Sequence, residues 1–374
     1  MQSKTIQKCF HFFKKEIVLC AAVILALLSC IFVPPSAAYF SYIDWDTLFL
    51  LFSLMSVMKG FQQLGAFIFL GNSLLKRTNT TRKLLLVLIF LPFVCSTIVT
   101  NDVSLITFVP FGLTVLKLAG REQLAAPVVV LQTLAANLGS MLTPMGNPQN
   151  LYLYAKSGMG FGSLCLLMLP YVAISGLLLL VDALLRKSLP VVPASVPVQM
   201  GSKKILICCT LGFVLCLLGI FDLIPPGIIA GVILLFFLFA DRSVLRHVDY
   251  SLLGTFFAFF IFTGNLGALP GFKETISSFL SGHVELTAIA TSQVISNVPA
   301  ALLLSGFTSQ WDKLIVGCNL GGLGTLIASM ASLISYKFFA EKYPGQRRRY
   351  LLMFTLYNLA YLALLFTTNL LIRR

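Results

Sequence analysis

Long apolar runs bounded by charged residues recur along the whole chain. The first covers residues 16 to 33, the second 46 to 72 and the last 350 to 371. About 20 such residues cross a bilayer as a helix. Backbone groups in lipid must bond internally, so uniformly apolar runs form helices, whereas barrel strands would alternate in polarity. Only 11% of the residues are charged, against about 25% in a soluble domain. The sequence therefore predicts an all-α polytopic membrane protein.

The basic residues, which give a net charge of +14, cluster in short loops. The positive-inside rule accounts for this placement, so it does not indicate a nucleic-acid partner. Lys14 and Lys15 before the first run predict a cytoplasmic N-terminus. Counting the runs onward predicts an external C-terminus, although Arg373 and Arg374 then violate the rule. We expect a multi-pass protein of the inner cell membrane.

One block of sequence occurs twice. Residues 137 to 154 read NLGSMLTPMGNPQNLYLY and residues 319 to 336 read NLGGLGTLIASMASLISY, with Asn, Leu, Gly, Thr and Tyr in register. Each copy follows a second polar break within apolar sequence, Thr100-Asn101-Asp102 in one half and Ser296-Asn297 in the other. Two related halves, each with two interrupted segments, are typical of secondary transporters built from repeats.

The charge pattern sets the organisation of these halves. Around each polar break the apolar arms are about 10 to 15 residues long, or about 15 to 22 Å as helix, too short for about 30 Å of hydrocarbon. One extra helix between the halves places the second repeat on the opposite side. We therefore predict inverted repeats with about nine transmembrane helices, two re-entrant hairpins and two broken helices. The expected boundaries are 1–187 for the first repeat (hairpin 84–117, broken helix 122–155), 188–224 for the linker and connecting helix, and 225–374 for the second repeat (hairpin 276–309, broken helix 312–337).

Two charged residues lie within apolar segments. Asp102 is the exception among thirteen acidic residues, and burying such a charge costs about 2.5 to 3.5 kcal/mol even on the lenient insertion scale. We expect it to bind the coupling ion; the alternative is a hairpin cap or a residue in an aqueous vestibule. Lys59 is the only basic residue near the middle of a span. It would hold an anionic substrate or neutralise Asp102, unless it reaches the interface.

Neutral polar residues at the breaks are the other candidates. Unwound helices present free carbonyls to a cation and N–H groups to an anion, although any one residue alone is more often a cap or interhelical bond. The expected ion-coupling residues are Asp102, Asn101, Asn147 and Asn150. The expected substrate-binding residues are Lys59, Asn101, Thr143, Ser296, Asn297, Asn319, Thr325 and Ser329. A sodium ion would lie near Asn101, Asp102, Asn147 and Asn297; we expect no cofactor beyond Na⁺ or H⁺.

At these residues the chain resembles the ion transporter superfamily. Thr100-Asn101-Asp102 with the apolar run to Pro110 looks like the hairpin motif of arsenite permeases, and residues 43 to 65 resemble the preceding helix in citrate and arsenite members. The two Asn-Leu-Gly blocks are similar to that family's broken helices. The divalent-anion/sodium symporters have Ser-Asn-Thr in both hairpins, whereas this chain has Thr-Asn-Asp and Ser-Asn-Val. Their two sodium sites therefore do not carry over as a set.

The resemblance implies an elevator-type secondary transporter for a small anion or oxyanion, such as arsenite, a di- or tricarboxylate or an inorganic anion, coupled to H⁺ or Na⁺. A sodium/proton antiporter and a passive anion channel are the alternatives. An enzyme is not expected, because the three histidines (His11, His247, His283) lie outside the expected spans and no nucleophile and base are paired. The expected partners are a small anionic substrate and membrane lipid, and the resemblance leaves room for a homodimer.

Overall fold

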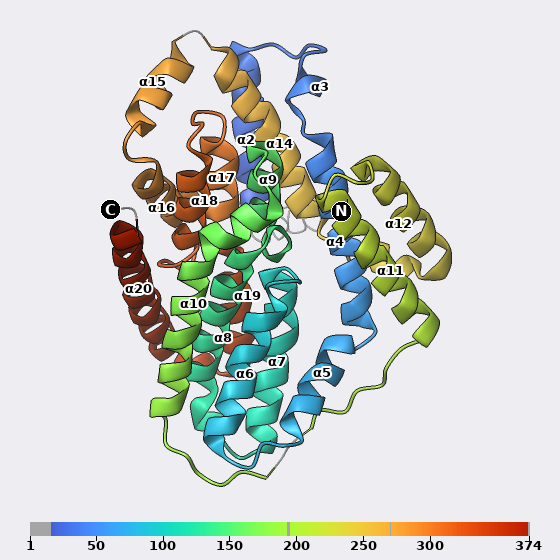
Figure 1. Ribbon diagram of the computed structural model, residues 1–374, viewed down its shortest axis with the longest axis vertical. Coiled ribbons are helices and arrows are strands. Elements are labelled where there is room, and N and C mark those ends of the chain that lie inside the picture. Colours follow the sequence, from blue (N-terminus) through green and yellow to red (C-terminus); the bar gives the residue numbers. More distant parts are fainter. Residues whose placement is uncertain (1–15, 193–194, 270, 373–374) are drawn as a thin grey trace, which may run out of the picture.

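The computed structural model describes residues 16–192, 195–269 and 271–372 (Figure 1). Within these ranges the chain is helical and contains no strand, only an isolated bridge between Thr80 and Pro190. This confirms the all-α prediction. Six of the described helices are long and apolar enough to cross a membrane, or seven if a bent pair counts as one span. The number of spans and the orientation of the termini stay predictions, and Lys14, Lys15, Arg373 and Arg374 lie outside the described residues.

Helices of similar order make up the two halves. The first half contains α2 (Ile17–Phe32), α3 (Tyr39–Tyr42), α4 (Trp45–Gln63), α5 (Ala66–Leu75), α6 (Thr81–Cys95), α7 (Asn101–Leu118), α8 (Ala125–Gly139), α9 (Pro148–Ser157) and α10 (Phe161–Leu185). The second contains α11 (Lys203–Ile220), α12 (Pro226–Ala240), α13 (Arg242–Arg246), α14 (Tyr250–Ala268), α15 (Phe272–Leu280), α16 (Val284–Ile295), α17 (Asn297–Leu304), α18 (Trp311–Gly321), α19 (Met330–Lys342) and α20 (Arg347–Ile372).

The single helix expected over residues 46 to 72 is wrong, because the chain bends by 54° between α4 and α5. Gly65 sits at the bend with φ +74°, a conformation that costs a residue with a Cβ but not glycine. The same device recurs in the other half, where Gly271 with φ +71° precedes α15. Both halves therefore place a left-handed glycine between their long helix and the short helix that follows it.

The starts of α4 and α14 are also alike. Asp44 caps α4 by accepting a bond from the Thr47 N–H at 3.0 Å, and Asp249 caps α14 through the Leu252 N–H at 3.0 Å. An aspartate at this position accepts one of the four N–H groups that a helix start leaves unpaired. Both long helices of the two halves begin by the same mechanism.

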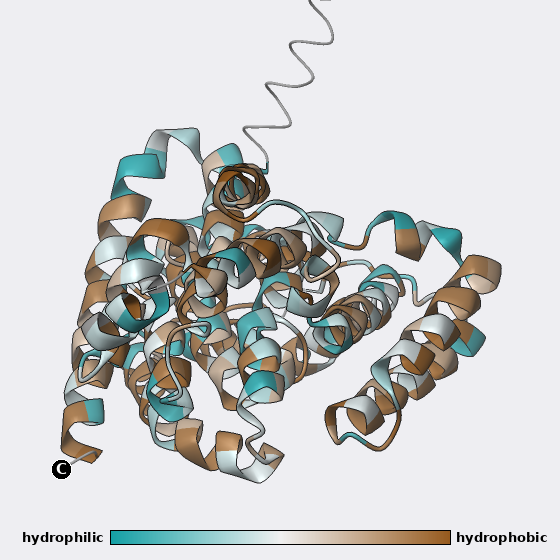
Figure 2. Cartoon of the chain, turned by 90° about the horizontal axis from the view of Figure 1, so that it is seen from above, coloured by the Kyte–Doolittle hydropathy of each residue, from teal (hydrophilic) through white to brown (hydrophobic). Residues whose placement is uncertain are grey.

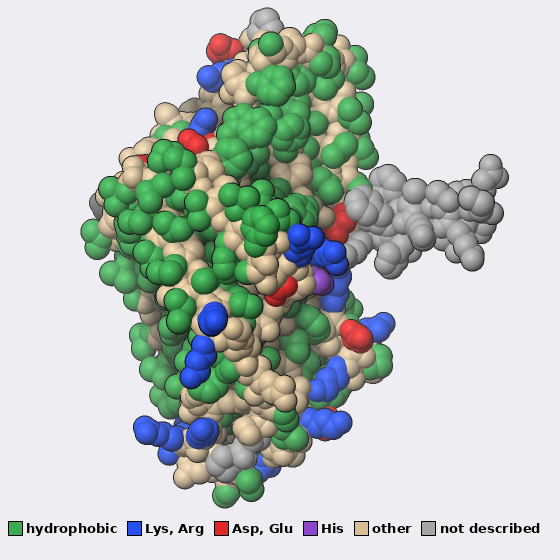
Figure 3. All heavy atoms as spheres, turned by 90° about the vertical axis from the view of Figure 1, so that its right-hand side faces the viewer, with side chains coloured by type: hydrophobic (Ala, Val, Ile, Leu, Met, Phe, Trp, Pro, Cys, Tyr) green, Lys and Arg blue, Asp and Glu red, His purple; other side chains and the backbone are tan. Residues whose placement is uncertain are grey.

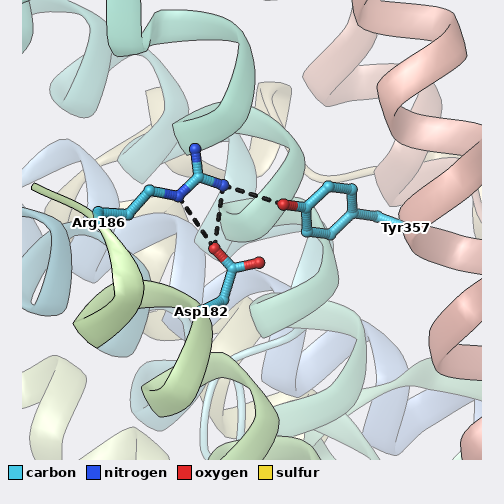
Figure 4. Close-up of polar contacts among 3 residues, drawn as sticks. All are labelled: Asp182, Arg186 and Tyr357. Carbon is cyan, nitrogen blue, oxygen red and sulfur yellow. Dashed lines mark hydrogen bonds and ion pairs between the residues drawn. The ribbon is translucent and has the colours of Figure 1, made fainter.

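The halves exchange packing partners. Helix α2 of the first half packs on α14 of the second, and α12 of the second packs on α4 of the first. Helices α10 and α20 pack together and both contact α8 (Figure 1). Near one end of this contact Arg186 bonds Asp182 and the Tyr357 hydroxyl, each at 2.9 Å (Figure 4). Through these bonds Arg186 links the end of α10 to α20, at a point away from the centre of the molecule.

Polarity is distributed as in a membrane protein. Outward-facing side chains of α10, α11 and α12, such as Leu166, Leu211 and Phe239, are apolar and exposed, and Figure 2 shows the pair α11 and α12, at the right, as largely hydrophobic. Fully buried polar side chains lie on α8 and α9, including Gln132 and Asn150. Since burying a polar group without a partner is costly, the interior contains an organised polar centre.

Candidate functional site

The polar centre is built where the two hairpins turn and the two discontinuous helices break. Helices α6 and α7 form one hairpin, and α16 and α17 the other. The break between α8 and α9 contains Pro144, and Pro148 is the first residue of α9; both lack the N–H that a continuous helix needs. The break between α18 and α19 contains Gly324 at φ +110°. Helices therefore end and restart at the polar breaks of the sequence, while the re-entrant course of the hairpins stays a prediction.

Four helix N-termini meet this centre, and their capping residues do not cap. Helices α7, α9, α17 and α19 begin after Thr100, Asn147, Ser296 and Ser329, and none of these side chains accepts a capping bond from its own helix. Such residues at the N-cap usually do, as Asp44 and Asp249 show in this chain. The Asp102 N–H of α7 bonds Asn101 Oδ1 and the Asn297 N–H of α17 bonds the Ala328 carbonyl, but the partial positive charge at each of these helix ends favours an anion.

The first asparagine of the duplicated block joins elements of both halves. Asn137 Oδ1 accepts bonds from Asn101 Nδ2 at 2.9 Å and from Ser329 Oγ at 3.1 Å. Its Nδ2 donates to Ser332 Oγ at 3.3 Å. One side chain on α8 thereby holds the tip of the first hairpin against the start of α19.

The equivalent asparagine in the second block makes the reciprocal contact. Asn319 Nδ2 donates to Asn150 Oδ1 at 2.7 Å. Asn319 and Asn137 occupy the same position of the block, as do Asn150 and Ser332. Asn319 Oδ1 differs, because it is buried and has no hydrogen-bond partner in the part of the chain that the structure describes. The second half therefore contains a buried acceptor that a donor or cation can satisfy.

The tip of the second hairpin is conformationally unusual. Ser296 has φ +75°, which is rare for a residue with a Cβ and costs about 1 to 3 kcal/mol. Its Oγ donates to the Ala328 carbonyl at 3.3 Å, and the Asn297 N–H donates to the same carbonyl at 3.0 Å. This tip is fastened to the break of its own discontinuous helix.

The two threonines of the block have the same local role. Thr143 Oγ1 donates to the carbonyl of Thr97 beside the first hairpin tip. Thr325 Oγ1 donates to the carbonyl of Gln293 at 3.1 Å, and its N–H donates to the Gln293 side chain at 2.8 Å. Thr143 is buried and Thr325 is exposed. Each hydroxyl ties a broken helix to its hairpin.

A small cavity contains the two charges that the sequence singled out. It has a volume of about 80 Å³, and its walls include Lys59 from α4, Asp102 from the first hairpin and Pro148 from α9. Lys59 Nζ donates to Gln62 Oε1 at 2.9 Å. No ion pair within 4.0 Å joins Lys59 to Asp102 among the described residues. The two charges thus face one cavity without being paired.

His247 and Asp249 complete this cavity, and Asp249 interacts electrostatically with Asp102. Figure 3 shows basic, acidic and histidine side chains gathered on this side of the molecule. The histidine is therefore beside the candidate site although it lies outside the long helices. Two carboxylates, one lysine and one imidazole provide groups that can bind a cation or exchange a proton.

Most of the predicted residues gather at the centre. Asn101, Asn150, Asn319 and Ser329 share its hydrogen bonds, and Asn147 is buried at the start of α9. Thr325 is the outlier, at the exposed edge of its break.

Sequence reasoning did not assign roles to Asn137, Asp249 or His247. The register of the block pairs Asn137 with the predicted Asn319, so the repeat itself contained that signal. For Asp249 the sequence contained a weaker signal, because Val248-Asp249-Tyr250 matches Ile43-Asp44-Trp45 before the equivalent long helix. For His247 the sequence contained no signal beyond its position next to this motif.

Comparisons with known proteins agree with this architecture. A family model described as citrate transporter matches residues 9–309. An inner membrane protein of Escherichia coli is 32% identical over 299 residues, covering 79% of this chain and 80% of the relative. An uncharacterized transporter of Methanocaldococcus jannaschii is 32% identical over 305 residues, covering 80% and 82%. A silicon efflux transporter of Oryza sativa is 36% identical over 132 residues, covering 35% and 27%.

Proposed function

The chain belongs to the citrate transporter family, and on that premise we propose that it is a secondary active transporter for a small anion or oxyanion in the inner cell membrane. The family and relatives are transporters rather than enzymes, which supports membrane anion transport in general. The substrate, the coupling ion and the mechanism are proposed from the site.

The observation that carries the anion proposal is the group of four uncapped helix N-termini. The N-cap side chains Thr100, Asn147, Ser296 and Ser329 accept no bond from the first turns of their helices. The Asp102 N–H of α7 bonds Asn101 Oδ1, and the Asn297 N–H of α17 bonds the Ala328 carbonyl. An anion at this centre would be stabilised by four favourable helix dipoles and by first-turn N–H groups that remain unbonded. Half-helix N-termini facing an anionic substrate group are a recurrent design in transporters with discontinuous helices.

Reciprocal contacts support an inverted repeat. The Asn137–Ser332 and Asn319–Asn150 bonds are the same contact with the halves interchanged. The packing of α2 on α14 and of α12 on α4 is likewise one contact with the two halves interchanged. A two-fold axis generates contacts of this kind, and α11, which has no counterpart in the first half, reverses the direction of the second half. Basic residues at the α5–α6, α10–α11 and α19–α20 connections would mark the cytoplasmic side, with the N-terminus cytoplasmic and the C-terminus external.

An elevator mechanism follows from the grouping of the helices. Helix α10 packs with α6 and α8, α20 packs with α8, α18 and α19, and the second hairpin joins this group through α18 and α9, while α11, α12 and α4 pack with one another. The cavity with Lys59 and Asp102 receives residues from both groups. We propose that the first group carries the substrate and moves relative to the second, so that Lys59 and Asp102 change their distance during transport.

Asp102 is the proposed coupling residue. It is the charged residue at the tip of a hairpin, and the equivalent position of the other hairpin is Val298. A proton or sodium ion that neutralises Asp102 would remove a charge that is expensive to carry across lipid. Lys59 would then be free to bind the anion. Binding of the proton or sodium ion would in this way be coupled to transport of the anion.

A sodium/proton antiporter is a second candidate, favoured by one observation. Asp102 and Asp249 line the same small cavity, and carboxylate oxygens are ligands for hard cations. In that case the anion would not be transported, and protons and sodium would compete for these carboxylates.

Uptake by the purified protein in liposomes tests these proposals. Citrate, arsenite, sulfate and phosphate are first compared by thermal shift with and without sodium at two pH values, since a ligand of the folded state raises its stability. The stabilising anion is then offered with an imposed proton or sodium gradient. We expect accumulation above equilibrium with one gradient. A lumenal pH change driven by sodium alone, without anion uptake, would favour the antiporter, and uptake that never exceeds equilibrium would favour a channel.

A further inference from the structure

A second hollow opens at the opposite end of the molecule from the α5–α6 connection, beside α15 (Figure 1). Its volume is about 550 Å³. Lys156 in the last turn of α9 and Lys273 on α15 line it together with the 305–310 loop. Hydroxyl groups of Ser277, Ser281 and Ser309 also lie on its wall. The hollow is therefore polar, whereas a lipid-facing groove would be apolar.

A difference in length between the hairpins creates this hollow. Helix α7 of the first hairpin has 18 residues, and α17 of the second has 8. The missing residues correspond to about 15 Å of helix, so the chain turns back at Ser305 instead of continuing outward. Ser277 Oγ on α15 donates to the Phe307 carbonyl at 2.8 Å. This bond holds α15, on one side of the hollow, against the 305–310 loop on the other side.

The charge of the lining is of one sign. Lys156 and Lys273 line the hollow, and no aspartate or glutamate of the described chain does. Neither lysine forms a side-chain hydrogen bond or an ion pair within 4.0 Å with another described residue. Glu274 and Asp312 are next in sequence to lining residues but are not part of the wall. A concave surface lined by one sign of charge concentrates ions of the opposite sign.

The position of the lysines is itself informative. In the proposed topology this end is external, and the positive-inside rule places lysines at the other end. Their presence here is not explained by membrane insertion. The 305–310 loop is also connected to the polar centre. Ser305 Oγ and the Tyr152 hydroxyl are hydrogen bonded at 2.7 Å, and Tyr152 lies on α9, whose first turn is part of that centre.

We propose that this hollow is an external anion-collecting site in which Lys156 and Lys273 bind a small multivalent anion, a polycarboxylate or an oxyanion, before it reaches the polar centre. The inference rests on the proposed function, in that the anion is the transported substrate. It adds a second, earlier binding site with its own residues.

Reaction rates of a cysteine placed in the hollow measure its potential. Ser309→Cys is treated in neutral-lipid vesicles with an anionic (sulfonatoethyl) and a cationic (trimethylammonioethyl) methanethiosulfonate, and labelling is followed on the peptide containing residue 309. We expect the anionic reagent to be favoured relative to Ser36→Cys, an exposed control in the α2–α3 connection at the same end. Lys156→Gln with Lys273→Gln should reduce the preference roughly tenfold at low salt, and salt should suppress it.

Several results would overturn the proposal. One is equal preference at residues 309 and 36, and another is a preference that survives removal of both lysines. Ser281→Cys replaces Ser309→Cys if the latter does not fold. Millimolar citrate should slow labelling by either reagent. If phosphatidylglycerol abolishes the preference and citrate does not protect, the lysines bind lipid phosphate and the site is not for a soluble anion.

The outcome is separable from that of the proposed function. Labelling requires no gradient and no turnover, so it remains interpretable if the chain proves not to accumulate anions. If both hold, the double lysine variant should raise the apparent KM for the transported anion at low salt while leaving kcat unchanged.

Discussion

The two hairpin tips both place an asparagine at the first residue of the second helix and differ in chemistry. At the first tip Asn101 bonds Asn137 on α8, and Asp102 follows it. At the second tip Asn297 is followed by Val298, and Asn319 on α18 has a buried oxygen without a partner among the described residues. One tip therefore has an ionisable group and lies against a satisfied amide, and the other has no charge and its half contains an unsatisfied amide oxygen at Asn319.

This difference suggests a division of roles between the halves. A carboxylate can change its charge by binding a proton or cation, whereas an amide oxygen only coordinates. Gradient coupling would then reside mainly in the first half. The second half would contribute neutral ligands to the substrate or to a cation. The following predictions test how far the two halves differ.

The glycines at equivalent block positions should respond unequally to a methyl group. A Cβ at Gly139 would overlap the backbone carbonyl of Phe93, which cannot move aside. A Cβ at Gly321 would meet the Ser292 side chain, with Oγ at 2.5 Å and Cβ at 2.8 Å, and a small shift between α18 and α16 can relieve this milder overlap. We expect Gly139→Ala to lower the stability by about 3 kcal/mol and Gly321→Ala by about 1 kcal/mol. Thermal unfolding in detergent checks this, and equal shifts would contradict it.

The two block asparagines should separate stability from ligand binding. Asn137→Ala removes three hydrogen bonds, and we expect a stability loss of about 2 kcal/mol. Asn319→Ala also removes an unpartnered oxygen, so its loss should be about 1 kcal/mol. Thermal shifts with and without anion and sodium provide the measurement. Asn319→Ala should lose the ligand-induced increment, and a full increment would exclude its oxygen as a ligand.

Lys59→Gln tests the lysine in the charged cavity. We expect the apparent KM for the transported anion to rise about tenfold, equivalent to about 1.4 kcal/mol, because the variant keeps a hydrogen-bonding group beside Gln62 but loses the charge. Concentration-dependent uptake measures it. Lys83→Gln is the control, since Lys83 is exposed and bonds only Asn79 through its side chain. A similar KM change in both variants would indicate a general surface-charge effect.

The contact between α10 and α20 joins one helix from each half. Weakening it should change neither gradient coupling nor ligand binding. Tyr357→Phe removes the hydroxyl that accepts a bond from Arg186 while leaving the Asp182 pair intact (Figure 4). We expect at most about 1 kcal/mol of lost stability and unchanged uptake kinetics. A large change in uptake would place this peripheral contact in the mechanism.

The helical class and the polar centre were predictable from local pattern. Apolar runs determine spans, and Pro144, Pro148 and the recurring Asn-Leu-Gly positions mark the breaks regardless of the rest of the chain. The bend at Gly65 was missed because one glycine in an apolar run does not reveal its φ angle. The neighbourhood of Asp102 was missed for another reason. His247 and Asp249 reach it only through tertiary packing of α14 against the first half.

Asymmetry was the least predictable property. The sequence indicates that Val298 replaces an aspartate. It does not show that Asn319 Oδ1 lacks a hydrogen-bond partner among the described residues while the Asn137 side chain makes three hydrogen bonds. That result depends on the relative positions of α8, α19 and both tips. The bonds between Asn137 on α8 and the start of α19 join residues nearly 200 positions apart in the sequence. The hollow beside α15 is a further consequence of the shorter second hairpin.

The central claim is that coupling resides in the first half, and Asp102→Asn in liposomes tests it most directly. Uptake of the transported anion is measured with an imposed gradient and, separately, as exchange without a gradient; Val298→Asn is the matched variant of the other tip. The account predicts that Asp102→Asn loses gradient-driven accumulation but retains exchange, and that Val298→Asn retains both. Accumulation by Asp102→Asn at the wild-type level, or an equal loss in both variants, would contradict it.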